Sequence, residues 1–156
     1  AEIARANGIP TCLDMYRFPD MAKLLQKISW CIPSQKSAEE FTKETDPRAM
    51  CRSILKYGPE IAGVTLGEQG TIFMSRNKTV IRKAFKVPVI DTTGAGDVFH
   101  GAFSFGMLQR WDLAKTVEFS SAVSAIKCTK LGGRAGIPTL PQVQAFLKKH
   151  VHEIRC

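Results

Sequence analysis

The sequence lacks the long apolar runs and the repeats that would place it in a special class of protein. Its uncharged stretches, residues 87–90 and 98–108 among them, are too short or too interrupted for the roughly 20 apolar residues of a membrane span. No internal repeat or low-complexity segment is visible. We therefore expect one folded α/β domain over residues 1–156, with no membrane partner.

Cysteines are few and follow no pairing pattern. The five form an odd number, include no CxxC pair, and lie scattered in apolar surroundings at positions 12, 31, 51, 128 and 156. Such cysteines are typical of reduced, structural thiols, and residues 1–8 carry no apolar stretch of the kind found in secretion signals. The sequence therefore favours a cytoplasmic location.

Trp and Tyr are scarce, while positive charge is abundant. The chain has 22 Lys+Arg against 14 Asp+Glu, a net charge of +8, which attracts nucleic acid, anionic lipid or phosphorylated metabolites. The densest basic cluster, residues 76–86, alternates with apolar residues like the solvated face of a strand and contains neither Trp nor Tyr. A platform for single-stranded nucleic acid needs aromatic faces between its cations, so we expect no nucleic-acid partner.

The hydrophobic pattern predicts an α/β fold. Apolar runs bounded by turn residues predict strands at 9–15, 28–32, 61–66, 71–74, 79–85 and 87–90, with a hairpin joining 71–74 to 79–85. Helical spacing predicts helices at 1–8, 19–27, 37–44, 47–57, 95–110, 112–129 and 141–152. Strands that alternate with helices at these lengths indicate βαβ crossovers, and hence a mainly parallel sheet with helices packed on its faces.

A glycine-rich loop follows the last predicted strand. Residues 91–97 read Asp-Thr-Thr-Gly-Ala-Gly-Asp, and a helix begins near Ala95. In open α/β sheets ligands bind at the carboxyl ends of strands, and the free amides at a helix N-terminus favour a phosphoryl group. We therefore interpret Gly94, Ala95 and Gly96 as an anion hole and Asp97 as a base for a nearby hydroxyl. Spacing alone also allows Asp97 a purely structural role beside the helix dipole.

Two common phosphate-binding motifs are absent, and two further glycine-rich segments are present. No GxxxxGK followed by Ser or Thr occurs, and Phe99 stands where a dinucleotide fingerprint needs its third glycine. Residues 65–70 follow a predicted strand and could face a nucleotide, although G-x-x-G is also common in hairpins. Residues 131–136 follow a helix and could cap it, shape a site, or do both.

Four segments together carry a family resemblance. They read VTLGEQG (64–70), VIDTTGAGDVFHGAF (89–103), FSSAVSAIKCTKLGG (119–133) and GIPTLPQVQAFL (136–147). In this order they resemble the carboxy-terminal half of the ribokinase-like carbohydrate kinases, also called the phosphofructokinase B family. The resemblance implies a Rossmann-like α/β sheet with helices on both faces, and phosphorylation of a sugar or sugar-like hydroxyl by ATP with Mg²⁺.

The resemblance also assigns roles to single residues. Asp97 resembles the catalytic base of the family, and Gly94–Gly96 its anion hole. Thr65, Gly67 and Gly70 resemble the nucleotide-binding loop of the family.

Two further roles concern the adenine and a monovalent cation. Ser121 falls where family members line the adenine pocket. Asp91 and Thr93, with the backbone of 132–136, resemble the loops that hold a monovalent cation such as K⁺ in many members. The resemblance further implies that two copies can pair as a homodimer.

The chain departs from the family in two ways. Where the family has an Asn-x-x-Glu motif in its magnesium and phosphate network, this sequence has Ser34 and Ser37, with Glu39 and Glu40 close but offset. Family members are also about twice as long, so we expect this chain to be the ATP-binding half of a larger kinase. Two functions stay open: a sugar kinase, or a non-catalytic nucleotide-binding or regulatory module that has lost the magnesium network.

Overall fold

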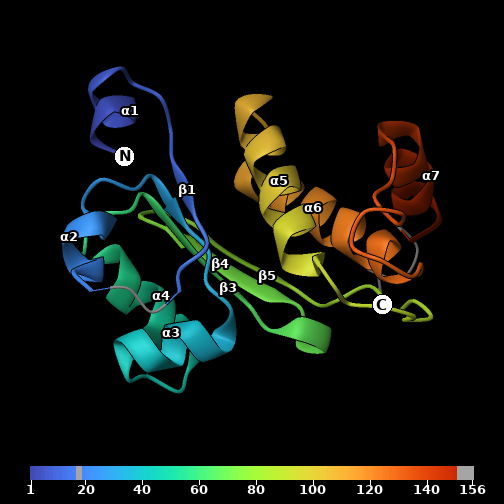
Figure 1. Cartoon of the computed structure of the whole chain (residues 1–156), viewed down its shortest axis with the longest axis horizontal. Helices are drawn as coiled ribbons and strands as arrows, with labels where there is room; N and C mark the ends of the chain where they lie inside the picture. The colour runs from blue at the N-terminus through green and yellow to red at the C-terminus, as the bar shows by residue number, and fades with distance from the viewer. Residues whose placement is uncertain (17–18, 151–156) are drawn as a thin grey trace. The chain divides into compact units, whose positions relative to one another are not determined.

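The computed structural model describes residues 1–16 and 19–150, and in it the strands and the longer helices occupy different parts of the chain (Figure 1). Residues 1–83, which we call unit 1, hold the five described strands. Residues 84–156, which we call unit 2, hold three helices. The sequence prediction of one domain over the whole chain stays a prediction.

Unit 1 contains a five-stranded mixed sheet. The strands are β1 (Cys12–Leu13), β2 (Trp30–Cys31), β3 (Ile61–Thr65), β4 (Thr71–Ser75) and β5 (Thr79–Arg82), which lie side by side in chain order. The β1–β2 and β2–β3 pairs are parallel, whereas β3–β4 and β4–β5 are antiparallel. The α/β fold class and the hairpin predicted from the sequence are therefore confirmed.

Unit 1 also contains short helices. They are α1 (Glu2–Ala6), α2 (Met21–Leu25), α3 (Gln35–Thr42), α4 (Pro47–Leu55) and the 3₁₀ turn η1 (Gly67–Gln69). The helix α4 begins where the Asp46 carboxylate accepts the amide of Ala49 at 2.8 Å, with Pro47 as its first residue. It packs on β3 and β4. The side chains of Met50, Cys51 and Ile54 are fully buried there.

Unit 2 is built on a helical hairpin followed by a third helix. Its helices are α5 (Ala95–Leu108), α6 (Leu113–Cys128) and α7 (Leu140–His150), and α5 runs beside α6 in Figure 1. A Cβ added at the buried Gly106 of α5 would lie 2.9 Å from Cγ2 of Thr116, so glycine allows the two helices to approach closely. The predicted helix 141–152 extends beyond the described residues at 151–152.

The predicted strand at 87–90 is wrong. No strand forms there in the described part of the chain, and Val89 and Ile90 are 61% and 63% exposed. Pro88 has no N–H to give to a ladder, and the amide of Ile90 donates to the Cys128 carbonyl of α6 at 2.8 Å instead. The segment before the glycine-rich loop is therefore anchored by a helix end and by no neighbouring strand of its own unit.

Adding a methyl group to Gly63 should destabilise the protein. Gly63 of β3 pairs directly with Phe73 of β4, and an added Cβ would overlap the fully buried Phe73 ring. We expect Gly63→Ala to lower the free energy of unfolding by about 1–3 kcal/mol. Urea unfolding measures this, with Gly101→Ala on α5 as a control, because nothing lies within 4 Å of a Cβ added there. An unchanged urea midpoint for Gly63→Ala would contradict the prediction.

Candidate active site

The glycine-rich loop turns into α5 through a left-handed residue. Gly94 is the N-cap of α5 and has φ 74°, a conformation that costs a side chain free energy. A Cβ added there would also lie 3.4 Å from the carbonyl oxygen of Gly133. The left-handed turn therefore requires glycine at this position, while residues 131–136 lie within ordinary contact distance of it.

Several amides at the start of α5 are available to a ligand. The Ala95 amide donates to the Thr92 carbonyl at 3.0 Å. Within the described chain, by contrast, no backbone or side-chain acceptor is found for the amides of Gly94, Gly96 and Asp97. These three donors, with the positive end of the helix dipole, are available to a phosphoryl group. Because the Ala95 amide already donates to Thr92, it is the least available of these amides to an anion.

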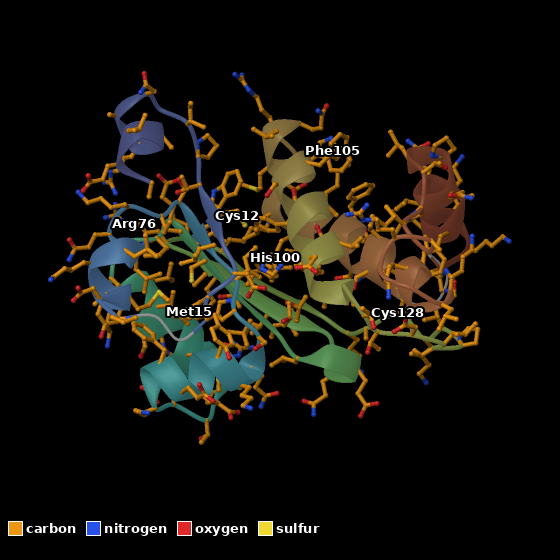
Figure 2. The ribbon with its side chains drawn as sticks, viewed as in Figure 1. Cys12, Met15, Arg76, His100, Phe105 and Cys128 are labelled. Atoms are coloured by element: carbon orange, nitrogen blue, oxygen red, sulfur yellow. The ribbon has the colours of Figure 1, made fainter. Side chains whose placement is uncertain are left out.

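Asp97 lies in the first turn of α5, and its side chain is exposed. It lines a cavity of about 680 Å³ whose polar lining includes Thr93 and Arg134. The rest of the lining is largely apolar and comes from α5, α6 and the segment up to α7: Val98, Ala102, Phe105, Phe119, Val123, Ile137, Pro138, Leu140 and Val143. One of these lining residues, Phe105 of α5, is labelled in Figure 2. The carboxylate of Asp97 is therefore open to a reacting group and is not packed in the core.

His100 supports the same helix turn. Its Nδ1 atom is 2.7 Å from the carbonyl oxygen of Gly96, one turn earlier, and the residue is labelled in Figure 2. The ring of Phe99 also contacts the His100 ring edge to face, at 6.3 Å between centroids. His100 thus contributes to packing at the start of α5.

Asp91 joins the two glycine-rich segments of unit 2. Its Oδ1 accepts the amide of Thr93 at 2.8 Å, and its Oδ2 accepts the amide of Gly132 at 2.7 Å. The Thr93 amide is the largest cause that lowers the pKa of Asp91 from 3.8 to about 2. Hydrogen bonds from the Thr93 hydroxyl and the Gly132 amide and the charge of Lys127 add to it, against desolvation. Asp91 is therefore a carboxylate at neutral pH that fixes the loop geometry.

This lowered pKa predicts a pH dependence of stability. Because the folded pKa lies below the unfolded value of 3.8, the Asp91 carboxylate stabilises the fold above that pH. The contribution is lost as the pH falls through about 2. We expect the unfolding free energy to fall more steeply between about pH 4 and pH 2 in the wild type than in Asp91→Asn, measured by urea unfolding. Parallel curves for the two proteins would contradict this.

The predicted nucleotide loop belongs to unit 1. Thr65 ends β3, and its hydroxyl is 3.5 Å from the Pro33 carbonyl oxygen that also accepts the Thr65 amide. Gly67 and Gly70 bracket η1 with φ 59° and 102°, and the Gly70 carbonyl accepts the amide of Leu66 at 2.8 Å. The segment is a tight, glycine-dependent turn with an exposed tip. Its role in binding a nucleotide stays a prediction.

Ser121 shares unit 2 with Asp97 but does not line the same cavity. It is half-buried on α6, where its hydroxyl donates to the Val117 carbonyl at 2.8 Å. Its place in an adenine pocket stays a prediction.

The sequence interpretation missed two polar residues of α6. Ser124 donates from its hydroxyl to the Ala95 carbonyl at 3.0 Å, which ties α6 to the start of α5. Lys127 is fully buried, and its Nζ donates to the Asp91 carbonyl oxygen at 2.8 Å. Little in the sequence pointed to Lys127, because two of the four buried residues that share its stripe of α6, at 113, 116, 120 and 123, are the polar Thr116 and Ser120.

Ser34 and Ser37 perform a structural task. The Oγ of Ser34 accepts the Ser37 amide at 3.3 Å and so caps α3, and the two hydroxyls lie 3.1 Å apart. The nearby Glu39 accepts a hydrogen bond from Gln35 at 2.8 Å. Over residues 1–16 and 19–150, no three His, Cys, Asp or Glu side chains gather into a group that could hold a metal ion.

None of the helices described in residues 1–16 and 19–150 has the length and apolar character needed to cross a bilayer.

Comparison with known proteins gives a consistent result. The family model described as pfkB family carbohydrate kinase matches residues 1–140. A ribokinase of Staphylococcus aureus is 35% identical over 153 residues, covering 91% of this chain and 49% of that protein. The crystal structure of a Thermotoga maritima ribokinase matches with a TM-score of 0.85 and 30% identity, over 94% of this chain and 52% of that one.

A further structure resembles the chain in fold alone. A putative ribokinase II from Escherichia coli, solved in complex with ATP and Mg²⁺, has a TM-score of 0.86 at 23% identity and is covered to 52% by this chain. The chain spans about half the length of the relatives it matches.

Proposed function

This chain belongs to the pfkB family of carbohydrate kinases, and from that membership we propose that it supplies the ATP-binding half and the catalytic base of a sugar kinase. The observation that carries the proposal is the start of α5. There the exposed carboxylate of Asp97 lies at the same helix start as the amides of Gly94 and Gly96, which donate to no acceptor among the described residues. A base and an anion site in one place are what phosphoryl transfer to a hydroxyl requires.

The proposed reaction is an in-line transfer. The Asp97 carboxylate takes the proton of a sugar hydroxyl, whose oxygen attacks the γ-phosphorus of ATP while the bond to ADP breaks. The amides of Gly94, Gly96 and Asp97 face the charge on the phosphoryl group in flight. The tight turn at Thr65, Gly67 and Gly70 is proposed to contact the nucleotide, and Ser121 the adenine.

Magnesium enters this proposal with the nucleotide. Mg²⁺ bound to the phosphates neutralises their charge, and such ions usually keep several waters and few protein ligands. Ser34 and Ser37 offer only neutral hydroxyls that already bond to one another. No step of the proposed reaction uses a magnesium ligand from this chain. A cytoplasmic location and a homodimer also stay predictions.

The same serines favour a second candidate function. A protein that keeps the nucleotide turn but has no carboxylate at position 37 could bind ATP without turning it over, as a non-catalytic or regulatory module. This alternative predicts ATP binding with no transfer to any sugar.

One experiment separates the two candidates. ATP is titrated into the protein by calorimetry, and ADP release is followed by a coupled assay over pentoses, ketohexoses and nucleosides. Binding together with sugar-dependent ADP release supports the kinase. Binding without release over the whole panel supports the module, and the absence of ATP binding contradicts both.

A further inference from the structure

The buried Lys127 points to a further property of this site. Lys127 lies in the last turn of α6, its side chain is fully shielded from solvent, and its Nζ donates to the Asp91 carbonyl oxygen at 2.8 Å. Burying a lysine ammonium is costly unless it is paired with acceptors and with negative charge. Its surroundings should therefore explain why the group is there.

The acceptors around Lys127 form a small negative site. Asp91 contributes both its carbonyl oxygen and a nearby carboxylate, and the charge of Lys127 is one of the causes that lower the pKa of this carboxylate. The negative end of the α6 dipole also lies here, because Lys127 precedes the last residue of the helix. The ammonium thus serves as the counter-charge of a site that would otherwise attract a cation.

Lys127 and Cys128 contact both glycine-rich segments. The carbonyl of the next residue, Cys128, accepts the amides of Ile90 and Asp91 at 2.8 and 3.2 Å. A Cβ added at Gly136 would overlap the Lys127 carbonyl, so the 132–136 segment packs directly on this helix turn. Lys127 therefore contacts Asp91 through its ammonium and the 132–136 backbone through its own carbonyl, and the family resemblance assigned these two groups, with Thr93, to a monovalent cation.

These residues do not fit a free potassium ion. One acceptor of the site, the Asp91 carbonyl, already accepts a hydrogen bond from Lys127 Nζ, and both carboxylate oxygens accept hydrogen bonds from backbone amides. A second cation a few ångströms from a buried ammonium would be repelled by it. We infer that the Lys127 ammonium takes the place of a dissociable monovalent cation at the glycine-rich loop, so that this protein needs no potassium. For activity, this inference rests on the kinase function proposed above.

A stability measurement tests the inference without any turnover. The melting temperature is compared in KCl and in tetramethylammonium chloride at equal ionic strength, because only K⁺ is small enough to enter the site. We expect the same melting temperature in both salts for the wild type. Lys127→Ala, which vacates the site, should melt at a lower temperature in tetramethylammonium and regain stability with KCl in a saturable way. Lys130→Ala, an exposed charge three residues away, should behave as the wild type.

Kinetics give the second readout. Wild-type turnover should change less than about twofold when K⁺ replaces tetramethylammonium, whereas Lys127→Ala should lose about tenfold or more and recover most of it in KCl. Lys127→Met, which keeps the side-chain bulk, should lose activity in both salts.

Several outcomes would overturn the inference. The inference fails if the wild type is more stable, or several-fold more active, in KCl than in tetramethylammonium chloride. This comparison needs no folded variant. Full activity of Lys127→Ala without K⁺ would also overturn it. If no sugar is phosphorylated, the kinase proposal fails, and the melting temperatures still decide the role of Lys127.

Discussion

Replacing Asp97 with Asn should lower kcat by about 10²–10⁴-fold, the usual contribution of a general base. Asparagine has nearly the same shape as aspartate, so the first turn of α5 and its free amides should persist. The variant loses only the ability to accept a proton from the sugar hydroxyl. We therefore expect the Kd for ATP, measured by calorimetry, to change little while turnover in the ADP-release assay collapses.

A matched variant controls for the loss of one negative charge in unit 2. Glu118→Gln removes a carboxylate from α6, outside the cavity that Asp97 lines, and should keep wild-type turnover. If Asp97→Asn retained turnover within a few fold of the wild type, Asp97 would have a structural role only. The kinase mechanism would then need another base.

Replacing Gly94 with Ala should lower kcat by about 10²-fold, comparable to the loss of one oxyanion donor. The φ of 74° is strained for alanine, whereas the new Cβ would only reach ordinary contact with the Gly133 carbonyl oxygen at 3.4 Å. To relieve the strain, the chain must rotate at residue 94, which reorients the amides of Gly94 and Gly96. We expect the unfolding free energy to fall by about 1 kcal/mol in addition.

Stability and activity separate the two effects of this change. Gly101→Ala adds the same methyl group inside α5, at a helical φ with open space around it, and should raise the unfolding free energy by up to about 1 kcal/mol. Urea unfolding of both variants isolates the cost of the left-handed turn. Wild-type turnover by Gly94→Ala would rule out these amides as the phosphoryl site.

The sequence predicted the long helices of unit 2 better than the strands of unit 1. Helices predicted at 95–110 and 112–129 end within two residues of α5 and α6, because long periodic segments with a capping Asp112 leave few alternatives. The strand predicted at 9–15 contracts to Cys12–Leu13, since hydrophobicity marks burial and not the extent of a hydrogen-bonded ladder. The strand predicted at 87–90 is missing for a different reason, because Pro88 has no N–H and the Ile90 amide donates to the Cys128 carbonyl.

The candidate site was predicted at the level of segments and not of atoms. Glycines between a predicted strand and a helix marked residues 91–97 correctly as a turn into α5. No sequence pattern could tell that the Ala95 amide donates to the Thr92 carbonyl while the Gly96 amide has no acceptor among the described residues. This difference depends on the backbone conformation of one turn at the start of α5. Lys127 was overlooked because lysine on a helix is normally solvated, and only the tertiary packing encloses it.

The anchoring of the glycine-rich loop limits which parts of the molecule can move during a catalytic cycle. The loop is attached to one end of α6 by the Cys128 carbonyl and the Lys127 ammonium, and to Gly132 just beyond that helix. Because residues 90–94 are held at three points, this segment has no hinge of its own and should keep its position during the reaction. Any closure that shields bound substrates from water must then be carried out by segments other than residues 90–94.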